Sequence, residues 1–324
     1  MSIEDHPRAE MSIVLVTDRY ETIRAVVRRL RAQTARDRLE IVIVAPSQAS
    51  LESNEAELEG FGGVQVVEGP IAPLAAGQAA GVRAARTPVV QLGETHAFPD
   101  PGWAEALIRA HAQSWAIVVP AVQNANPDGP LSWANILLDY GEFIDGLPAR
   151  EVFHTPTHNP AFRRSLLLEY EDRLEVALSG GYEISVDWRA RGCRFYFEPS
   201  AKIAHANVSR PRHWLRQRYL AGIVHASERS VSWSRARRLL YACACPLVPA
   251  VVLSRIAAAV QLLLGQEELP PLTLPALVVG AIAVAAGEAM GYAGGAGSAH
   301  KQRLDEYELN KRRYIRRAEV GTYA

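Results

Sequence analysis

The sequence predicts an α/β protein with a mostly parallel sheet and a helical extension toward its C-terminal end. Two observations predict the sheet: short apolar runs recur along the first two thirds of the chain, and segments with helical periodicity separate them. A third predicts the extension, because the composition becomes almost wholly apolar from residue 239 onward.

The first hundred residues alternate between expected strands and helices. Buried strands are expected at residues 12–16 (SIVLV), 39–44 (LEIVIV), 64–67 (VQVV) and 88–92 (PVVQL). Residues 23–30 place apolar side chains on one side and arginines on the other, which is typical of a helix. Residues 75–85 are rich in alanine and contain Gly77 and Gly81, so we expect a helix with a small-residue face.

The pattern continues less regularly beyond residue 100. We expect a helix at residues 104–112, a strand at 115–120 and a helix over 132–144 after the loop NANPDGP. Two separate strands, CRFYFEP (193–199) and AKIAHA (201–206), are expected to follow an acidic helix.

Composition excludes some classes of function. The chain of 324 residues is 48% hydrophobic, enough for a sizeable core. It has 35 basic and 35 acidic residues, and this balance argues against nucleic-acid binding. The three cysteines form no disulfide framework and no paired metal motif, and the first residues are acidic where a secretory signal is basic and then apolar. We therefore expect an intracellular protein.

Residues 239–264 and 272–287 are the two longest apolar runs. A membrane-spanning helix needs roughly 20 apolar residues, so both runs are marginal. They can be two buried core helices, or a helical hairpin dipped into or across a membrane. The basic segments SRARR (234–238) and 301–317 flank the pair and favour a hairpin whose ends stay cytoplasmic. We expect association with the cytoplasmic face of the cell membrane, with a soluble cytoplasmic protein as the alternative.

The segment VVQLGETHAFPDPGW (89–103) places Glu94 and His96 directly after an expected strand. Ligands of parallel α/β sheets bind beyond the carboxyl ends of the strands. A carboxylate and an imidazole at that position predict a divalent-cation site with open positions for phosphate oxygens. The alternative is a turn carboxylate beside a surface histidine.

Several segments together resemble a known family. They are SIVLVTDRYETIRAVVRRLRAQ, LEIVIVAPS, AAGQAAGVRAARTPVVQLGETHAFPDPGWAEAL, HNPAFRRSLL and GGYEISVDWRARGCRFYFEPSAKIAHAN. In this order they resemble a family 2 glycosyltransferase of the GT-A fold, the nucleotide-diphospho-sugar transferase fold with a Rossmann-like sheet. The resemblance covers about residues 11–225, which we expect to form the transferase domain, with residues 226–324 as a helical, membrane-associated region.

The resemblance implies a metal site. In that family an acidic motif, usually D-x-D, holds a divalent cation on the diphosphate of the sugar nucleotide, and here Glu94 and His96 occupy its place. His205, near the end of the strand after the acidic helix, is implied as a third residue on the metal or the diphosphate, although a histidine in a strand is as often a packed core residue. The expected ion is Mn²⁺ or Mg²⁺, and imidazole suits Mn²⁺ better.

The family also carries a pair of acidic residues at the start of a helix, the second of which is the catalytic base. Alignment on GGYEISVDWR places Glu183 at the base position and Tyr182 where the companion acid lies. Asp187 is a weaker candidate for the same role or for positioning substrate. An inverting displacement is expected from the family. The alternative is that Glu183 only caps its helix.

The remaining substrate contacts are also carried over from the family. Thr17 and Asp18 are expected to contact the nucleotide, while Gln217 and Arg218 on a late helix would lie over its diphosphate. His158 and Asn159 would border the acceptor pocket. The alternatives are solvated helix residues and an ordinary loop.

Departures from the family pattern leave two readings open. The chain has Ala45-Pro46-Ser47 where an aspartate often reads the nucleobase, and Gly77-Gln78 where an arginine-asparagine pair is usual. We favour a metal-dependent glycosyltransferase at the cytoplasmic membrane face, with a nucleotide-sugar donor and a lipid-linked or cell-envelope acceptor. The alternative is a catalytically inactive, membrane-associated binding or scaffold protein. A nucleotidyltransferase is set aside because TDRYET lacks the glycines of a triphosphate loop.

Overall fold

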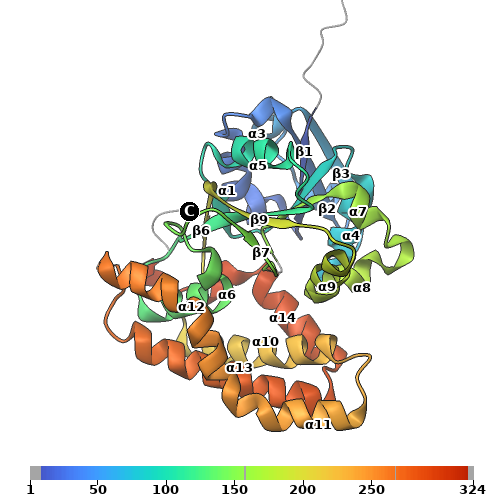
Figure 1. Ribbon diagram of the computed structural model, residues 1–324. Coiled ribbons are helices and arrows are strands. Elements are labelled where there is room, and N and C mark those ends of the chain that lie inside the picture. Colours follow the sequence, from blue (N-terminus) through green and yellow to red (C-terminus); the bar gives the residue numbers. More distant parts are fainter. Residues whose placement is uncertain (1–8, 157, 267, 320–324) are drawn as a thin grey trace, which may run out of the picture. The chain divides into compact units, whose positions relative to one another are not determined.

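The computed structural model describes residues 9–156, 158–266 and 268–319, and the chain divides into two compact units (Figure 1). The first unit contains the residues up to 121 together with 148–204, and the second contains 122–147 together with the residues from 205 onward. Each unit is therefore made of two separate stretches of sequence.

The first unit is organised around a sheet of nine strands among the described residues. The strands are β1 (Met11–Val16), β2 (Leu39–Ala45), β3 (Gly63–Glu68), β4 (Val89–Gly93), β5 (Ala97–Pro99), β6 (Ile117–Asn124), β7 (Arg150–Val152), β8 (Ala161–Arg163) and β9 (Phe195–His205). Their order is β3-β2-β1-β4-β8-β6-β9-β5, and β7 pairs with β9. Strands β1 to β4 pair in parallel, while β8 runs antiparallel to both β4 and β6.

The register of the parallel strands places the carboxyl ends of β1 and β4, where a ligand can bind, side by side. Strand β1 pairs with β4 from Met11 opposite Val89 to Leu15 opposite Gly93. The loops that follow β1 and β4 therefore leave the sheet at the same edge. Every residue of β1 and β2 is buried, as expected for central strands of a parallel sheet covered on both faces.

Helices connect the strands of the first unit. The longer ones are α1 (Tyr20–Arg31), α4 (Leu74–Ala84), α5 (Trp103–His111) and α9 (Tyr182–Ala190), and the shorter ones are α2 (Gln48–Leu51), α3 (Glu55–Leu58), α7 (Arg164–Leu168) and α8 (Leu174–Gly180). Helix α4 packs closely on the sheet, because a Cβ atom at Gly81 would lie 2.3 Å from Cγ1 of Val14 and one at Gly77 only 2.6 Å from the carbonyl oxygen of Pro70. This close packing explains why glycine stands at position 77.

The structure corrects two expected boundaries. Residues 195–205 form one continuous strand, β9, where two strands separated at residue 200 were expected. Pro199 lacks a backbone N–H but does not interrupt the extended chain. Strand β6 begins at Ile117 and continues to Asn124, past the expected end at residue 120.

The second unit is largely helical. Its helices are α6 (Pro130–Tyr140), α10 (Pro211–Arg229), α11 (Arg235–Ala244), α12 (Val248–Gly265), α13 (Thr273–Gly294) and α14 (Ser298–Leu309). Helix α10 packs along α13 at backbone distance, since a Cβ atom at Gly287 would lie 2.1 Å from the carbonyl oxygen of Tyr219. The boundary expected between residues 225 and 226 falls inside α10, and the compact units do not divide the chain there.

Two stretches of this unit are long and apolar enough to cross a membrane, Arg235–Gly265 with a mean hydropathy of 2.1 and Thr273–Gly294 with 1.7. The first stretch comprises α11 and α12, joined by a short 3-10 turn at Cys245–Leu247. Length and composition alone do not distinguish a membrane helix from a core helix of a soluble protein.

Candidate functional site

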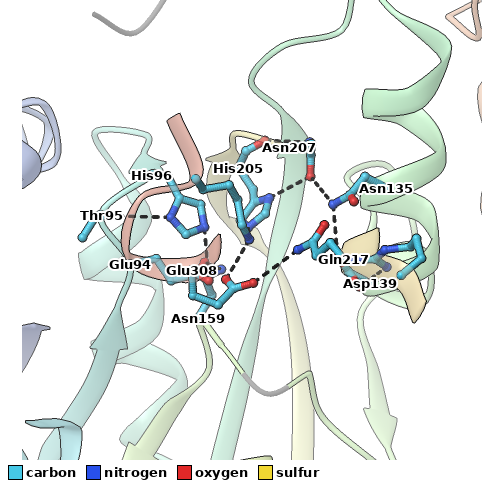
Figure 2. A network of polar contacts seen from close by, with 12 residues as sticks. Glu94, Thr95, His96, Asn135, Asp139, Asn159, His205, Asn207, Gln217 and Glu308 are labelled. Atoms are coloured by element: carbon cyan, nitrogen blue, oxygen red, sulfur yellow. Dashed lines mark hydrogen bonds and ion pairs between the residues drawn. The ribbon is translucent and has the colours of Figure 1, made fainter. Parts of the chain in front are cut away.

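The loop between β4 and β5 carries the two residues predicted to bind a metal. Glu94 and His96 are both buried, with 7% and 1% of their surface exposed. Oε1 of Glu94 lies 3.4 Å from Nε2 of His96, and the other ring nitrogen of His96 lies 3.3 Å from the hydroxyl of Thr95 (Figure 2). The two side chains therefore converge at the carboxyl end of β4.

Asn159 holds the Glu94 carboxylate in place. Its side-chain amide donates a hydrogen bond of 2.6 Å to Oε2 of Glu94 (Figure 2). The backbone carbonyl of Asn159 accepts a hydrogen bond of 3.4 Å from the side-chain amide of Gln91 in β4. The antiparallel pairing of Gln91 with Ala161 brings this segment beside β4. Asn159 is fully buried and has a left-handed backbone with φ of 71°. Asparagine tolerates that conformation better than most residues, and such strain is often found at functional sites.

His158 adds a third candidate ligand from the same loop. One of its ring nitrogens and a carboxylate oxygen of Glu94 lie within 4.8 Å of one another. Its Nδ1 is buried and makes no hydrogen bond within the part of the chain that the structure describes. His158 and Asn159 lie within reach of Glu94, and their expected place at the acceptor pocket stays a prediction.

The ligand atoms of Glu94 and His96, in the loop between β4 and β5, fit a divalent cation. Two ligand atoms held by one ion at about 2.1 Å each lie no more than about 4.2 Å apart. The 3.4 Å between Glu94 and His96 is within that limit. Carboxylate oxygen with imidazole nitrogen suits Mn²⁺ better than Mg²⁺, which prefers oxygen ligands throughout.

The loop after β1 carries the residues predicted to contact a nucleotide. Thr17 is buried; its backbone N–H donates to the carbonyl of Val44, and its hydroxyl donates to the carbonyl of Arg19 over 2.7 Å. Asp18 accepts a hydrogen bond of 2.8 Å from the hydroxyl of Thr22 and keeps 39% of its side chain exposed. Asp18 therefore stabilises the start of α1 and can still accept a bond from a ligand. Its contact with a nucleotide stays a prediction.

Helix α9 carries the predicted base. It begins after Gly181, whose φ of 65° is in the left-handed region that favours glycine. Glu183 lies in the first turn, where the helix dipole favours a negative charge, and it forms an ion pair with Arg173. The side chains of Arg173 and Glu183 are 70% and 37% exposed, and ion pairs so exposed are weak. The carboxylate therefore remains accessible to a substrate.

Asp187 lies one turn further along α9. Its carboxylate accepts a hydrogen bond of 2.8 Å from the hydroxyl of Tyr170 and lies 3.5 Å from the guanidinium of Arg191. Burial and the bond to Asp187 raise the pKa of Tyr170. Tyr170 therefore remains a hydrogen-bond donor to Asp187 at neutral pH, which fits a positioning role better than that of a free base.

His205, in the second unit, lies within a buried polar network (Figure 2). Its Nδ1 lies 2.9 Å from Oδ1 of Asn207, and its Nε2 lies 3.4 Å from Nζ of Lys311. A lysine ammonium can only donate, so Nε2 of His205 is the acceptor and Nδ1 carries the proton given to Asn207. Lys311 also contacts Glu308 over 2.7 Å. His205 as a metal ligand stays a prediction, and binding through Nε2 requires Lys311 to move.

Gln217 and Arg218 lie on α10 in the same unit, and both are buried. Arg218 forms a bidentate ion pair with Asp139 of α6, over 2.6 and 2.8 Å, and Gln217 donates to Glu308 over 3.4 Å (Figure 2). These contacts give Arg218 a structural role in joining two helices. A diphosphate contact by either residue stays a prediction.

Sequence reasoning missed much of this network. Asn126, Asn135, Asn207 and Lys311 are buried and hydrogen-bonded. Single asparagines in a loop or a helix, and a lysine in the basic segment 301–317, carry no local signal for burial. The side chain of Asn126 donates to the carbonyl of Asn207, which is distant in sequence. Only the tertiary structure brings such residues together.

The residues 12–170 match the family model described as Glycosyl transferase family 2. No curated protein matches the chain. The matched residues include the Glu94–His96 loop and Asn159, and they end before α9. The predicted fold class, an α/β protein of the GT-A type with a mostly parallel sheet and C-terminal helices, is confirmed.

Solved structures of other proteins are similar to the chain at low identity. TarS of S. aureus is 14% identical with a TM-score of 0.43, and the match covers 70% of this chain and 44% of that one. GalNAc-T7, solved with UDP, GalNAc and Mn²⁺, is 16% identical with a TM-score of 0.42, and the match covers 62% and 44%. The mannosyltransferase PcManGT of Pyrobaculum calidifontis, solved with GDP-Man and Mn²⁺, is 16% identical with a TM-score of 0.45, and the match covers 86% of each chain. The chain thus spans 44% of the length of the first two proteins.

Proposed function

The chain belongs, through residues 12–170, to glycosyl transferase family 2, and we propose that it is a metal-dependent enzyme that moves a sugar from a nucleotide-diphosphate donor to an acceptor hydroxyl. One observation carries the proposal: Glu94 and His96 converge 3.4 Å apart at the carboxyl end of β4, with Asn159 orienting the carboxylate. A carboxylate held so closely in a buried loop beside an imidazole suits ion binding better than a surface turn does.

Glu94 and His96 would hold the divalent cation, with His158 and His205 as further candidate ligands. When bound, the cation supplies positive charge that stabilises the departing diphosphate. The protein contributes the geometry: Asn159 fixes the orientation of the Glu94 carboxylate, and Thr95 contacts the ring of His96. The burial of both ligands excludes competing water.

Glu183 would act as the base. The acceptor oxygen attacks the anomeric carbon, the bond from that carbon to the diphosphate oxygen breaks, and the acceptor proton passes to the Glu183 carboxylate. Attack opposite to the leaving group gives inversion at the anomeric carbon. The exposed ion pair with Arg173 can open to admit the acceptor, and Asp187, held by Tyr170, would position it.

The nucleotide would lie against the loop after β1. The register of the sheet puts the loops after β1 and β4 at one edge, so a nucleotide held by Thr17 and Asp18 can extend its diphosphate toward Glu94. Gln217 and Arg218 are proposed as additional diphosphate contacts.

The acceptor would be lipid-linked or part of the cell envelope, and the enzyme would act at the cytoplasmic face of the cell membrane. Support for this comes from the two apolar stretches Arg235–Gly265 and Thr273–Gly294, with the basic segment SRARR at the start of the first. A membrane-bound enzyme gains access to an acceptor that cannot leave the bilayer.

A donor screen tests the activity directly. The purified chain, in detergent with Mn²⁺, is incubated with a panel of UDP- and GDP-sugars, and the released nucleoside diphosphate is measured. We expect release with one class of donor, loss of that release on chelation of the metal, and a loss of 10²-fold or more in Glu183→Gln, roughly the contribution of general base catalysis.

Glu175→Gln is the matched control, because Glu175 is an exposed carboxylate in the first turn of the neighbouring helix α8. It should leave the rate unchanged. Full activity of Glu183→Gln would refute the assigned base. Nucleotide binding without turnover of any donor, and without dependence on metal, would instead support the inactive scaffold protein.

A further inference from the structure

Helix α13 exposes a continuous apolar stripe in the second unit. Leu274, Val278, Ile282 and Met290 follow one another at spacings of four or eight residues, and each is 43% to 55% exposed. Each step of four residues turns by about 40° around a helix, so these side chains, with Ala286 between the last two, form a stripe that winds around about 160° of the exposed side of α13. A row of large apolar side chains exposed on a helix marks a surface that binds another protein or a membrane.

The opposite face of α13 is closed by α10. Cβ atoms at Gly280, Gly287 and Gly291 would collide with Trp214, Tyr219 and Ile223 of α10. The contacts advance in the same direction along both helices, so α10 accompanies α13 over half of its length. Only the apolar stripe is left to contact a partner.

The charged residues of α10 determine whether α13 can span a membrane or must lie flat on its surface. Arg212 and Arg216 are exposed on α10, and Arg216 lies between Trp214 and Tyr219, the residues that contact Gly280 and Gly287. If α13 spanned a bilayer, its fixed neighbour would carry Arg216 near the bilayer centre, where an unpaired charge is costly. A helix lying flat leaves α10 and its arginines on the water side.

Helix α11 lies beside the C-terminal end of α13 and adds positive charge. The ring of Trp233, just before α11, stacks on Tyr292 of α13 with centroids 5.6 Å apart, and the guanidinium of Arg237 lies 4.0 Å from the Trp233 ring. Leu239 and Leu240 are 60% and 66% exposed. Exposed leucines beside arginines and aromatic rings are typical of a helix in the plane of an anionic membrane surface.

We propose that α11 and the exposed stripe of α13 form one membrane-binding face that lies flat on a bilayer containing anionic phospholipids, without crossing it. The apolar side chains enter the boundary between head groups and acyl chains, and the arginines, with Arg235 and Arg237 foremost, contact lipid phosphates. This inference deepens the membrane association of the proposed function by giving the mode of binding and the lipid class.

Vesicle binding tests the proposal without any measurement of activity, so its failure is distinct from a failure of glycosyl transfer. The full chain is mixed with vesicles of phosphatidylcholine alone, or with an equal part of phosphatidylglycerol, and the bound fraction is measured by flotation. We expect binding to the anionic vesicles, weakened roughly 30-fold in R235Q/R237Q because each basic residue contributes about a fivefold factor.

The apolar stripe is tested by V278E/I282E, which should lose binding to the anionic vesicles. V64E/V176E is the matched control, since Val64 and Val176 are exposed valines of the first unit, and it should bind like the unaltered chain. Circular dichroism confirms that each variant is folded. Unchanged binding of folded V278E/I282E would overturn the proposal. Dimerisation of the unaltered chain through the stripe, with no binding to either kind of vesicle, would also overturn it.

Depth measurements separate a flat helix from a spanning one. Single cysteines replace Leu274, Ile282 or Met290 in a chain whose native cysteines are changed to alanine, and each carries a fluorophore that brominated lipids quench. The outer two positions are about 24 Å apart along a helix. A flat helix predicts shallow positions for all three probes, with Ile282, in the middle of the stripe, deeper by no more than about 5 Å, the radius of a helix. An Ile282 about 12 Å deeper than both ends, near the bilayer centre, would overturn the proposal.

Discussion

Asn159 donates a hydrogen bond of 2.6 Å to the Glu94 carboxylate from a backbone held at φ of 71°. The strained backbone directs the amide onto the carboxylate of Glu94 in the loop after β4. Residues that orient metal ligands typically contribute 10- to 100-fold to metal affinity or activity. We therefore expect Asn159→Ala to weaken Mn²⁺ binding by about that factor, measured as the dependence of donor turnover on Mn²⁺ concentration.

Asn159→Gly is the informative companion to that variant. Glycine adopts the left-handed backbone without strain but also lacks the amide. An orienting role predicts the same loss of Mn²⁺ affinity in both variants. Recovery in the glycine variant would mean that the backbone conformation matters and the hydrogen bond does not.

Glu94→Gln should reduce Mn²⁺ binding by about tenfold or more, because the substitution removes the only negative charge offered by the Glu94–His96 pair. The free ion can be followed by its electron paramagnetic resonance signal during a titration. Glu175→Gln serves as the control. Equal Mn²⁺ affinity in the unaltered chain and in Glu94→Gln would place the ion elsewhere.

The buried pair of Arg218 and Asp139 should contribute chiefly to stability. Removing one partner of a buried ion pair typically costs about 3 to 5 kcal/mol, and Asp139 is 30% exposed, so we expect the lower end of that range for Asp139→Asn. Urea unfolding measures the loss. If Arg218 also contacts the diphosphate, Arg218→Lys will raise the KM for the donor in preparations that remain folded, and Asp139→Asn will change the KM less.

His111 predicts how stability depends on pH. It is buried on α5 with Nε2 3.2 Å from the carbonyl oxygen of Ala161, and burial lowers its pKa from 6.5 to about 4. Between these values the unfolded chain takes up a proton that the folded chain does not, so stability is complete above pH 6.5 and is lost as the pH falls toward 4. The full effect is about 3 kcal/mol.

His111→Gln should therefore flatten the pH dependence between 6.5 and 4. The free energy of unfolding in urea is compared at several pH values for both proteins. A difference that does not change with pH would show that His111 is protonated equally in the folded and unfolded chains.

The fold was predictable where the signal is local. Strands β1, β2 and β4 are apolar runs separated by helical periodicity, and α5 follows a proline-glycine turn. Strands β5 and β8 have three residues each, too few for any periodicity. The antiparallel position of β8 beside β4 depends on tertiary pairing, which the sequence does not express locally.

The site was predictable to a similar extent. The position of Glu94 and His96 after β4 follows from a rule about parallel sheets. The role of Asn159 does not, because its contact with Glu94 joins residues 65 positions apart. The buried surroundings of His205 and Arg218 could not be predicted from the sequence either, because residues far away in the chain, in the second unit, supply them.

The insertion of β8 beside β4 makes the metal loop dependent on a late segment of the chain. During synthesis the whole acidic motif emerges long before Asn159 does, so a nascent chain that ends near residue 150 has both ligands and lacks the group that aims one of them. If the Glu94–His96 loop binds Mn²⁺ as proposed, the full affinity for the ion will develop only in a chain that has grown past Asn159 and has paired β8 with β4.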